Sequence, residues 1–363
     1  MSTKILFAGG GTAGHVEPAL AVATWLKNAK PNWELTFVGT NNGLENQLVP
    51  KAGFELKHIP KVLMPRQFTP AILIWPVKIV FATLKAIKVC RDADLVIGFG
   101  GYACPPIYLA AALLRKPIFI HEANAIPGWA NRLGAVFASE IFIAFTRTQK
   151  KIGRWRSAKL SGMPIRAEII AAANLSPEES SQIKNDQLEK WNLSKTKPTI
   201  LVFGGSQGSR HINEAILQSL SAFTEKGVQV VHSVGRSNAL PTSTENYLPL
   251  SYIDDMSSAY HAADLIIARS GALTCAELAA VGKFAILIPL PIGNGEQSAN
   301  AFDLQEAGAA ELVADNKFNA DWLISNWDEI WRKASSFKPV NQGEFSASEI
   351  IGKIIIDCVE DKK

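Results

Sequence analysis

Cysteine is scarce in this sequence, and its spacing excludes two common uses of the residue. The four cysteines lie at positions 90, 104, 275 and 358. None forms a CxxC pair or stands near histidines at the spacing of a zinc site, so neither a structural zinc nor a disulfide framework is expected. Scattered thiols are typical of a reducing compartment. Charge is modest as well, because a net charge of +4 is too small to imply a nucleic-acid partner by itself.

Long hydrophobic runs are also absent. The most apolar stretch, residues 71–84, contains Pro76 and Lys78 and falls short of the roughly 20 residues that a membrane-spanning helix needs. The apolar run near the N-terminus, Lys4–Ala8, is too short for the core of a signal peptide and leads straight into glycines. We therefore expect a buried first strand and a protein that is not exported.

What the sequence does contain is enough apolar material for two cores. It has 363 residues, of which 47% are hydrophobic, and a chain of this length usually divides into domains. Short β-branched or aromatic runs alternate with helical patterns, which is typical of parallel sheets covered by helices on both faces. Strands are predicted at 4–8, 34–38, 54–59, 95–98, 117–121, 140–143, 199–203, 229–233, 265–268, 285–288 and 311–313. Helices are predicted at 14–27, 70–91, 105–114, 127–138, 209–223, 273–281, 297–306 and 347–359.

The two halves of the chain open alike, with a buried strand, a glycine cluster and a helix. The first opening is ILFAGGGTAGH at 5–15 and the second is ILVFGGSQGS at 200–209, and the polar stretch 172–197 lies between them as a linker or a helix at a domain edge. We predict an α/β fold of two doubly wound, Rossmann-like domains facing each other across a cleft. The predicted domains are residues 1–165 and 166–345, with a helix in about 346–363 packing back on the first. Both glycine loops should line the cleft, because ligands bind beyond the carboxyl ends of such strands.

The first glycine loop matches the dinucleotide pattern, with Gly9, Gly11 and Gly14 at the required spacing. A nicotinamide cofactor is disfavoured, since the second strand ends Val38-Gly39-Thr40 with no carboxylate for a ribose. The glycines could also serve helix–strand packing alone. Otherwise, the bare amides of a helix N-terminus suit an anion or a sugar diphosphate. His15 follows in the first turn, either as a buried structural histidine or as a general base.

The second half holds a similar turn between a strand and a helix, at residues 268–274. Glu277 follows on that helix, where a carboxylate can accept hydrogen bonds from two vicinal ribose hydroxyls. The alternative is a solvated acid favoured by the helix dipole. Downstream, Gln297 and Asn300 carry amides suited to sugar hydroxyls, although an asparagine here could equally be an N-cap.

Taken together, these strings resemble the MurG family of N-acetylglucosaminyltransferases, which have the GT-B fold and make lipid II from lipid I. The similarity covers nearly the whole chain, in the family's order and spacing. The matching strings are GGGTAGH (9–15), GGY (100–102), HEAN (121–124), GMPIR (162–166), GGSQG (204–208), YIDDM (252–256), RSGALTCAE (269–277) and EQSANA (296–301). The chain departs from the family pattern at Met163, at Ala123 and in the loop that reads GlyGluGln at 295–297.

The resemblance implies a role for each matched residue. Inverting transfer would move N-acetylglucosamine from UDP-GlcNAc to the C4 hydroxyl of a polyprenyl-diphosphate-linked muramyl peptide, with no cofactor and no metal. His15 occupies the position suspected of assisting deprotonation of the acceptor. The residues implied in binding UDP-GlcNAc are Thr12, Ala13, Gly14, Asn124, Arg166, Ser206, Ile253, Ala272, Leu273, Thr274, Cys275, Ala276, Glu277, Gln297 and Asn300.

The segment Leu63 to Arg91 mixes apolar and basic side chains. The pattern alone favours a core helix with a solvated basic face. The resemblance reverses that preference, because a lipid-linked acceptor implies a protein bound peripherally at the cytoplasmic face of the plasma membrane, against an anionic surface. The predicted membrane patch is Ile74, Trp75, Lys78, Phe81, Leu84 and Lys85.

Two other classes of protein fit parts of the pattern. A UDP-N-acetylglucosamine 2-epimerase shares the two-domain fold and the donor, but it needs no lipid-facing patch. A nucleotide-sugar-binding regulator would bind the donor without turning it over. The residues around 9–15 and 98–106 favour the transferase.

Overall fold

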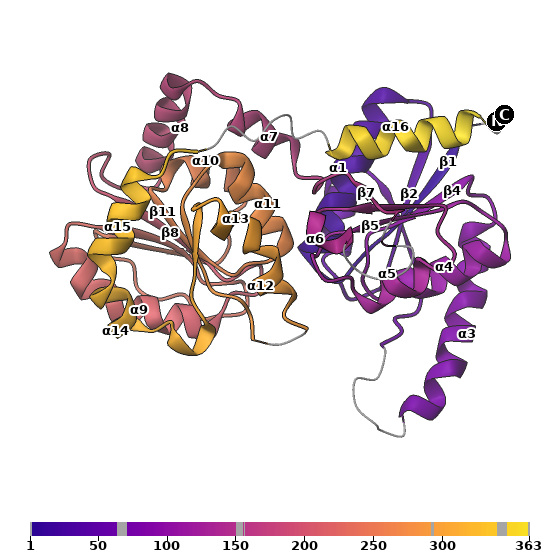
Figure 1. Ribbon diagram of the computed structural model, residues 1–363, viewed down its shortest axis with the longest axis horizontal. Coiled ribbons are helices and arrows are strands. Elements are labelled where there is room, and N and C mark those ends of the chain that lie inside the picture. The colour runs from indigo at the N-terminus through magenta and orange to yellow at the C-terminus, as the bar shows by residue number, and fades with distance from the viewer. Residues whose placement is uncertain are drawn as a thin grey trace. The chain divides into compact units, whose positions relative to one another are not determined.

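The computed structural model describes residues 2–63, 71–149, 155, 157–291, 294–339 and 347–361, with only the backbone described for 71–73. It divides the chain into two compact units (Figure 1). The first unit comprises Met1–Arg166 together with Phe345–Lys363, and the second comprises Ala167–Glu344. Each unit is described by itself below. The functional roles predicted for the two domains are separate from this division and stay predictions.

The first unit is built on a parallel sheet with the order β3-β2-β1-β4-β5-β6-β7 over the described residues. Its central strands β4 and β5 are buried along their whole length, as expected for a sheet covered on both faces. The order reverses between β1 and β4, which is the switch point of a doubly wound sheet. The strands are β1 (Lys4–Ala8), β2 (Glu34–Gly39), β3 (Glu55–His58), β4 (Leu95–Gly98), β5 (Ile118–Glu122), β6 (Glu140–Ile143) and β7 (Lys159–Leu160).

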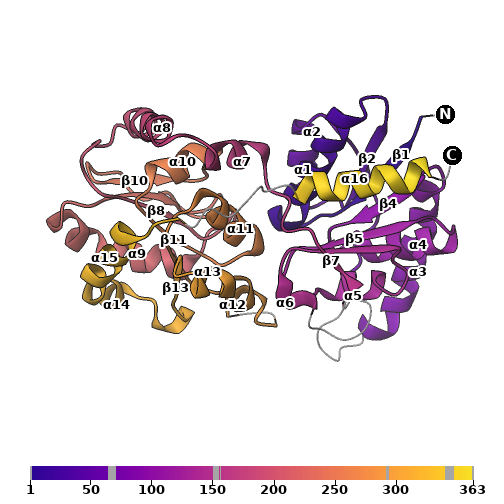
Figure 2. The same cartoon turned by 45° about the horizontal axis from the view of Figure 1, so that its top comes forward.

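Helices cover both faces of this sheet (Figure 2). One face packs against α1 and α16, and the other against α3, α4 and α5. The helices are α1 (Ala13–Ala29), α2 (Glu45–Lys51), α3 (Ala71–Cys90), α4 (Cys104–Leu113), α5 (Trp129–Gly134), α6 (Thr146–Gln149) and α16 (Ala347–Glu360).

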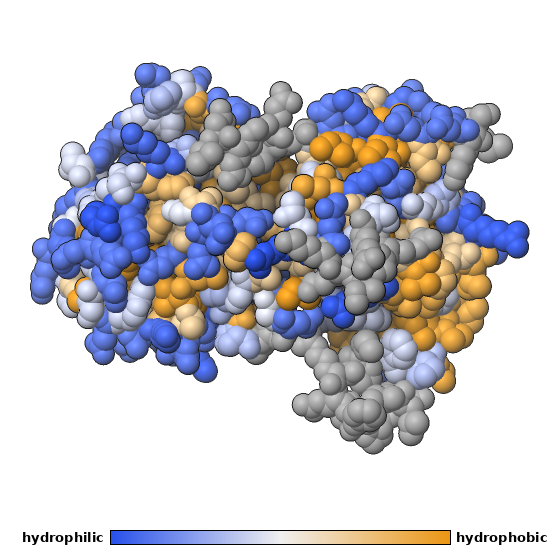
Figure 3. All heavy atoms as spheres, in the orientation of Figure 1, coloured by the Kyte–Doolittle hydropathy of each residue, from blue (hydrophilic) through white to orange (hydrophobic). Residues whose placement is uncertain are grey.

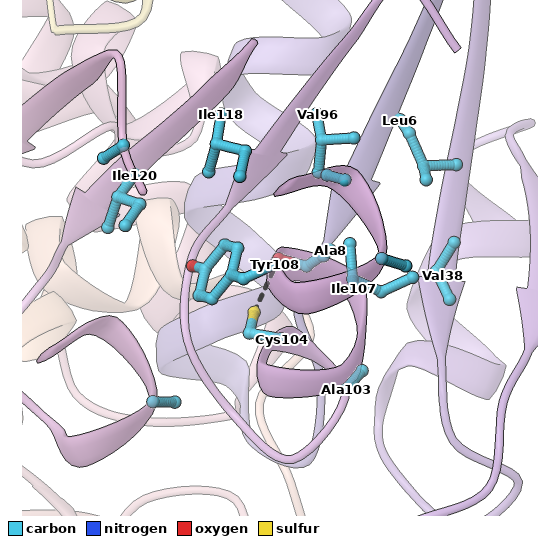
Figure 4. Packing of buried hydrophobic residues seen from close by; sticks show 14 of the residues in the cluster. Leu6, Ala8, Val38, Val96, Ala103, Cys104, Ile107, Tyr108, Ile118 and Ile120 are labelled. Carbon is cyan, nitrogen blue, oxygen red and sulfur yellow. Dashed lines mark hydrogen bonds between the residues drawn. The ribbon is translucent and has the colours of Figure 1, made fainter. Parts of the chain in front are cut away.

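Tyr108 of α4 anchors the second of these two cores (Figure 4). Its ring is fully buried, and its hydroxyl donates a hydrogen bond to Asn131 Oδ1 at 2.8 Å. A Cβ added at Gly98 or Gly134 would lie within 2.0 or 2.4 Å of Tyr108, so both positions require glycine. Beside it, the Cys104 thiol donates to the carbonyl oxygen of Ala8 at 3.3 Å. This packing fixes α4 against the carboxyl end of β1.

The C-terminal helix α16 belongs to the first unit and lies beside α1 (Figures 1 and 2). Ile351, Ile355 and Val359 are buried in the same core as α1. Gly352 faces the ring of Trp25, where an added Cβ would lie 2.2 Å from a ring carbon.

The second unit repeats the design with a parallel sheet in the order β10-β9-β8-β11-β12-β13 over its described residues. The order again reverses beside the first strand of the unit, between β8 and β11. The strands are β8 (Thr199–Phe203), β9 (Gln229–Ser233), β10 (Tyr247–Leu250), β11 (Leu265–Ala268), β12 (Ala285–Leu287) and β13 (Ala310–Leu312). The helices are α7 (Ala167–Ala173), α8 (Pro177–Lys190), α9 (Arg210–Glu225), α10 (Met256–Ala262), α11 (Ala272–Val281), α12 (Glu296–Asn300), α13 (Phe302–Glu306), α14 (Ala320–Ser325) and α15 (Trp327–Ser336), with a short 3-10 turn η2 (Asp315–Lys317).

Two predicted helices differ in extent from those observed. The helix predicted over 297–306 is two helices, α12 and α13, with Ala301 between them. The helix predicted over 127–138 is shorter, because α5 begins after Gly128 and ends at Gly134. Gly134 packs directly against the Tyr108 ring. The polar stretch 172–197 is largely helical, since Ser176 and Glu179 form a capping box that starts α8.

Candidate functional site

The first glycine loop lies at the switch point of the first sheet. It follows β1, and the loop at 100–102 follows the neighbouring strand β4. The two loops touch, because a Cβ added at Gly101 would lie 2.3 Å from the carbonyl oxygen of Gly10. Gly101 also has a φ of +89°, so this position needs glycine for two reasons. The topology therefore brings together two glycine turns that are about 90 residues apart in the sequence.

His15 lies in the first turn of α1, whose N-cap is Thr12. Its ring is part-buried against the second loop, since a Cβ added at Gly100 would lie 3.0 Å from Nδ1. Nδ1 is buried and has no hydrogen-bond partner among the described residues. Burial lowers the pKa of His15 below 6.5, and the backbone of Phe99 and the charge of Glu45 oppose that shift. Both interpretations of His15, as a structural histidine and as a general base, therefore stay predictions.

The loop after β5 is organised by the buried carboxylate of Glu122. One carboxylate oxygen accepts from the backbone and side-chain nitrogens of Asn124, at 2.9 and 3.3 Å. The other accepts from the backbone of Gly128 and from Asn131 Nδ2, both at 3.0 Å. The predicted residue Asn124 is thus held in place by a neighbour that sequence reasoning missed. The signal was an acid at the end of a fully buried strand.

The glycine loop of the second unit has the same place in its own sheet. It follows β8, beside the switch point. Gly205 and Gly208 have φ of +86° and +74°, and a Cβ at Gly208 would lie 1.9 Å from the carbonyl oxygen of Val234. Ser206 is part-exposed in this turn, and Ser209 accepts from the backbone of Ile212 as the N-cap of α9.

Arg269 ties the turns of this sheet edge together, and sequence reasoning did not assign it a role. Its guanidinium donates to Ser209 Oγ at 2.8 Å, behind the glycine loop. It also donates to the carbonyl oxygen of Ile288 at 3.2 Å, to that of Pro289 at 3.4 Å, and to Asp315 Oδ1 at 2.5 Å. The side chain is largely buried, so these are charge-assisted hydrogen bonds shielded from solvent. They hold the ends of β8, β11, β12 and β13 in one arrangement.

The turn into α11 carries the predicted residues Ala272 to Glu277. The N-cap is Gly271, and Ser270 before it is fully buried, with an Oγ that has no hydrogen-bond partner in the described part of the chain. Glu277 is only 4% exposed and accepts a hydrogen bond from the Tyr260 hydroxyl at 2.8 Å. The alternative of a solvated helix-start acid is therefore wrong. Leu273, Thr274 and Ala276 are part-exposed, whereas Cys275 is buried in the core side of the helix.

Three further predicted residues of the second unit lie in a loop or in the short helix α12. Ile253 is buried in the loop between β10 and α10. Gln297 turns back toward its own loop, where its Oε1 accepts from the backbone of Leu290 at 2.9 Å. Asn300 is 1% exposed and is not an N-cap, because Gly295 caps α12 and Ala301 caps α13. The N-cap alternative is wrong here too.

Arg166 ends the first unit, whereas Ser206 and the α11 turn belong to the second. That these residues bind one diphosphate together therefore stays a prediction. No group of three His, Cys, Asp or Glu side chains suited to a metal ion occurs among the residues that the structure describes.

The helix α3 presents two different faces. Ile79, Ala82 and Ala86 are buried in the core of the first unit, as the core-helix interpretation expects. On the other face, five large apolar side chains are each more than half exposed: Ile74, Val77, Val80, Phe81 and Leu84. Val77 and Val80 were not part of the predicted membrane patch.

The apolar face of α3 is visible as part of a hydrophobic surface over α3 and α4 in Figure 3. Lys78 and Lys85 are exposed on the same helix, and Lys85 lies over the ring of Phe81 at 5.5 Å. Trp75 differs from the prediction, since it is half-buried and packs edge-on against Trp129. Residues 64–70 of the predicted segment lie outside the described ones. None of the helices within the described ranges is both long and apolar enough to cross a membrane.

Two family models match the chain. Residues 5–143 match the glycosyltransferase family 28 N-terminal domain, and residues 199–353 match the C-terminal domain of the same family. Together they cover most of the chain, the first model reaching through β6 of the first sheet and the second spanning the second sheet.

Curated relatives cover nearly the full length. A protein of Corynebacterium diphtheriae is 40% identical over 99% of this chain and 98% of its own length. One of Frankia casuarinae is 44% identical over 90% of this chain and 86% of its own. Both are named UDP-N-acetylglucosamine–N-acetylmuramyl-(pentapeptide) pyrophosphoryl-undecaprenol N-acetylglucosamine transferase.

Solved structures agree on the fold. The crystal structure of Acinetobacter baumannii MurG superposes with a TM-score of 0.71 at 27% identity, covering 98% of this chain and 99% of that one. A UDP-GlcNAc 2-epimerase from Neisseria meningitidis, solved with UDP-GlcNAc, superposes with a TM-score of 0.63 at 14% identity, covering 98% of this chain and 100% of that one. At that identity the epimerase likeness concerns the fold alone, whereas the curated transferases share sequence along nearly the whole chain.

Proposed function

The chain belongs to glycosyltransferase family 28 and, within it, to the MurG family, and we propose that it catalyses the reaction for which those relatives are named. It transfers N-acetylglucosamine from UDP-GlcNAc to the muramyl sugar of an undecaprenyl-diphosphate-linked peptide, which forms lipid II for peptidoglycan. The observation that carries the proposal is the pair of sheets whose switch points both carry glycine turns. The full-length similarity to named transferases then selects the reaction.

The donor binds to the second unit in this proposal. Diphosphate oxygens would accept hydrogen bonds from the backbone amides at the start of α11, and the positive end of the helix dipole would stabilise their charge. Glu277 supports a ribose site, because its buried carboxylate is oriented by Tyr260 and can accept from two hydroxyls. As UDP leaves, the same amides and Arg166 would stabilise the developing charge. Ile253 would contact uracil, and Gln297 and Asn300 the sugar.

The acceptor binds to the first unit, beside the first glycine loop. There the C4 hydroxyl of the muramyl sugar attacks C1 of N-acetylglucosamine on the face opposite the leaving UDP, so the configuration inverts and a β-1,4 bond forms. His15 takes the proton of that hydroxyl in our proposal. Its support is a part-buried ring with a lowered pKa and an unpartnered Nδ1 among the described residues. Thr12, Ala13, Gly14 and Asn124 surround the reacting sugars.

The membrane surface is the proposed location of the acceptor. The exposed apolar side chains of α3, flanked by Lys78 and Lys85, are suited to insertion among the head groups of an anionic bilayer. A contiguous apolar surface of this kind on a folded unit is more often an interaction site than a chance feature. The enzyme would then act peripherally, at the cytoplasmic face of the plasma membrane.

A release assay tests the proposed reaction against its two rivals. The enzyme is given UDP-GlcNAc with and without a polyprenyl-diphosphate-linked muramyl peptide, and free UDP is measured. A transferase releases UDP only when the acceptor is present. An epimerase would convert the donor without that acceptor, and a regulator would bind it without any turnover. Either of those results would contradict the proposal.

A further inference from the structure

Glu45 is a buried carboxylate directly beside the first glycine loop. It is the first residue of α2, which follows β2, and it is 0% exposed. One carboxylate oxygen accepts from the backbone N–H of Gly11 at 2.8 Å. The other accepts from the backbone N–H of Thr40 at 2.9 Å and from its hydroxyl at 3.1 Å. A carboxylate buried this deeply is stable only with such donors.

Three glycines make room for this carboxylate. A Cβ added at Gly10, Gly39 or Gly43 would lie 2.6, 2.4 or 1.9 Å from an atom of the Glu45 side chain. None of the three has a positive φ, so the backbone does not by itself require glycine there. The missing side chains leave the space that Glu45 fills.

The second strand itself ends without a carboxylate, as the sequence indicates, because Glu45 lies beyond it, on α2. In a dinucleotide-binding sheet, an acid at the end of this strand accepts from the ribose. Here both oxygens of Glu45 are engaged by donors of the protein itself, at Gly11 and Thr40. The carboxylate is therefore directed at the glycine loop and not at a ligand.

We infer that Glu45 is a positioning residue for the transfer reaction, acting through the first glycine loop. Its bond to Gly11 holds that residue at a φ of +92°, immediately before Thr12 caps α1 and His15 enters the helix. The loop's amides and His15 thereby receive one fixed orientation toward the acceptor. The inference rests on the proposed role of this loop in turnover.

Glu45→Gln tests the inference with a side chain of the same shape. An amide can replace one oxygen, but its NH₂ group would face the donor N–H of Gly11 or Thr40. We expect kcat to fall about 10²-fold, the loss that a small misplacement of reacting groups can cause. The dissociation constant for UDP, measured by calorimetry, should stay within about 3-fold, because the nucleotide contacts proposed at α11 and Ile253 lie in the second unit. Glu55→Gln is the matched control, since Glu55 is an exposed acid on the neighbouring strand, and it should leave kcat unchanged.

Gly43→Ala is a second, independent substitution that displaces the same carboxylate. The added methyl group lies outside the glycine loop but collides with Glu45. We expect it to lower kcat in the same way, and the double variant with Glu45→Gln should be no slower than the slower single variant. Independent losses that multiply would contradict a shared route through Glu45.

Thermal unfolding of each variant separates positioning from folding. A purely structural Glu45 would lower the melting temperature and the active fraction, leaving kcat per folded enzyme as in the wild type, and that result would overturn the inference. Full kcat in a folded Glu45→Gln protein would overturn it as well. If the wild type itself released no UDP with the lipid-linked acceptor, the proposed function would fail instead, so the two failures are distinguishable.

Discussion

Burial acts in opposite directions on the ionisable side chains around the first glycine loop. It lowers the pKa of His15, because the interior disfavours the imidazolium. It raises the pKa of Glu122, although the donors from Asn124, Gly128 and Asn131 favour the ionised form. Because the pKa of His15 is lowered from 6.5, its ring is suited to accept a proton from a neutral hydroxyl at a pH near 7. Glu122 lies at the end of β5, where its carboxyl group is held by hydrogen bonds from its own loop.

Replacing His15 by alanine tests its part in the chemistry. We expect kcat to fall by about 10²-fold or more, the usual contribution of a general base. UDP affinity, measured by calorimetry, should change little because the nucleotide contacts proposed at α11 lie in the other unit. Near-normal turnover in this variant would remove His15 from the mechanism.

The pH dependence of kcat/KM gives a second test at the same residue. His15 accepts a proton only when it is neutral, and its pKa is lowered from 6.5. Activity should therefore be retained as the pH falls through 6.5 and should decline only below it, with a limb that reports the free enzyme. If kcat/KM instead declined with a midpoint above pH 6.5, a group other than His15 would control the loss of activity at low pH.

At the scale of helices and strands, two of the elements that the sequence did not predict have a clear physical cause. The strand β10 contains Pro249, which argues against a central strand, and it is tolerated because β10 lies at the edge of its sheet. The helix α2 is seven residues long and contains Pro50, so its helical pattern is too short to recognise. Because α2 was not predicted, the position of Glu45 at its start was not predicted either.

The exposed face of α3 predicts binding to anionic vesicles. Val77, Phe81 and Leu84 changed together to serine should weaken sedimentation with such vesicles at least about 10²-fold, given the apolar area removed. UDP release with a water-soluble acceptor should be unchanged. A triple serine variant of the exposed residues Leu217, Leu240 and Ile324 in the second unit is the control. Equal vesicle binding by both variants would mean that the exposed apolar face of α3 does not bind the membrane.

The packing of α16 predicts a large effect at one position and a small one nearby. Ile355 is fully buried against the first unit, so Ile355→Ala should lower the free energy of unfolding by about 2–5 kcal/mol. Ile350, on the same helix, is 36% exposed, and Ile350→Ala should cost much less. Urea unfolding measures both. Similar losses would mean that α16 is not packed as described.

At the scale of the whole chain, the sequence predicted where the two glycine loops lie better than it predicted the buried side chains that hold these loops in place. Strand–glycine–helix patterns place both loops at the switch points, because that placement depends on local signals and on the order of a doubly wound sheet. Arg269 was not assigned, since its partners come from several elements whose packing only the structure gives. Glu122 was missed although its partners are local, within nine residues along the chain. The joint arrangement of Arg166 with the second unit's residues stays a prediction.

Differential scanning calorimetry with UDP tests the assignment of the donor to the second unit. At a concentration of about 100 times its dissociation constant, UDP should stabilise the unit that binds it by about 2.7 kcal/mol. We expect only one of two transitions to move. The Ile355→Ala variant identifies the other transition, because its defect lies in the first unit. A shift in the transition weakened by Ile355→Ala would contradict the assignment.

The return of α16 to the first unit makes the second unit an insertion within the first. The polypeptide passes between the units twice, once after Arg166 and once before Phe345. A protease that cleaves only one of these crossings would leave two fragments held together by the packing of α16 on the first unit, and the nicked enzyme would still elute as a single particle. Release of the second unit would require cleavage of both crossings.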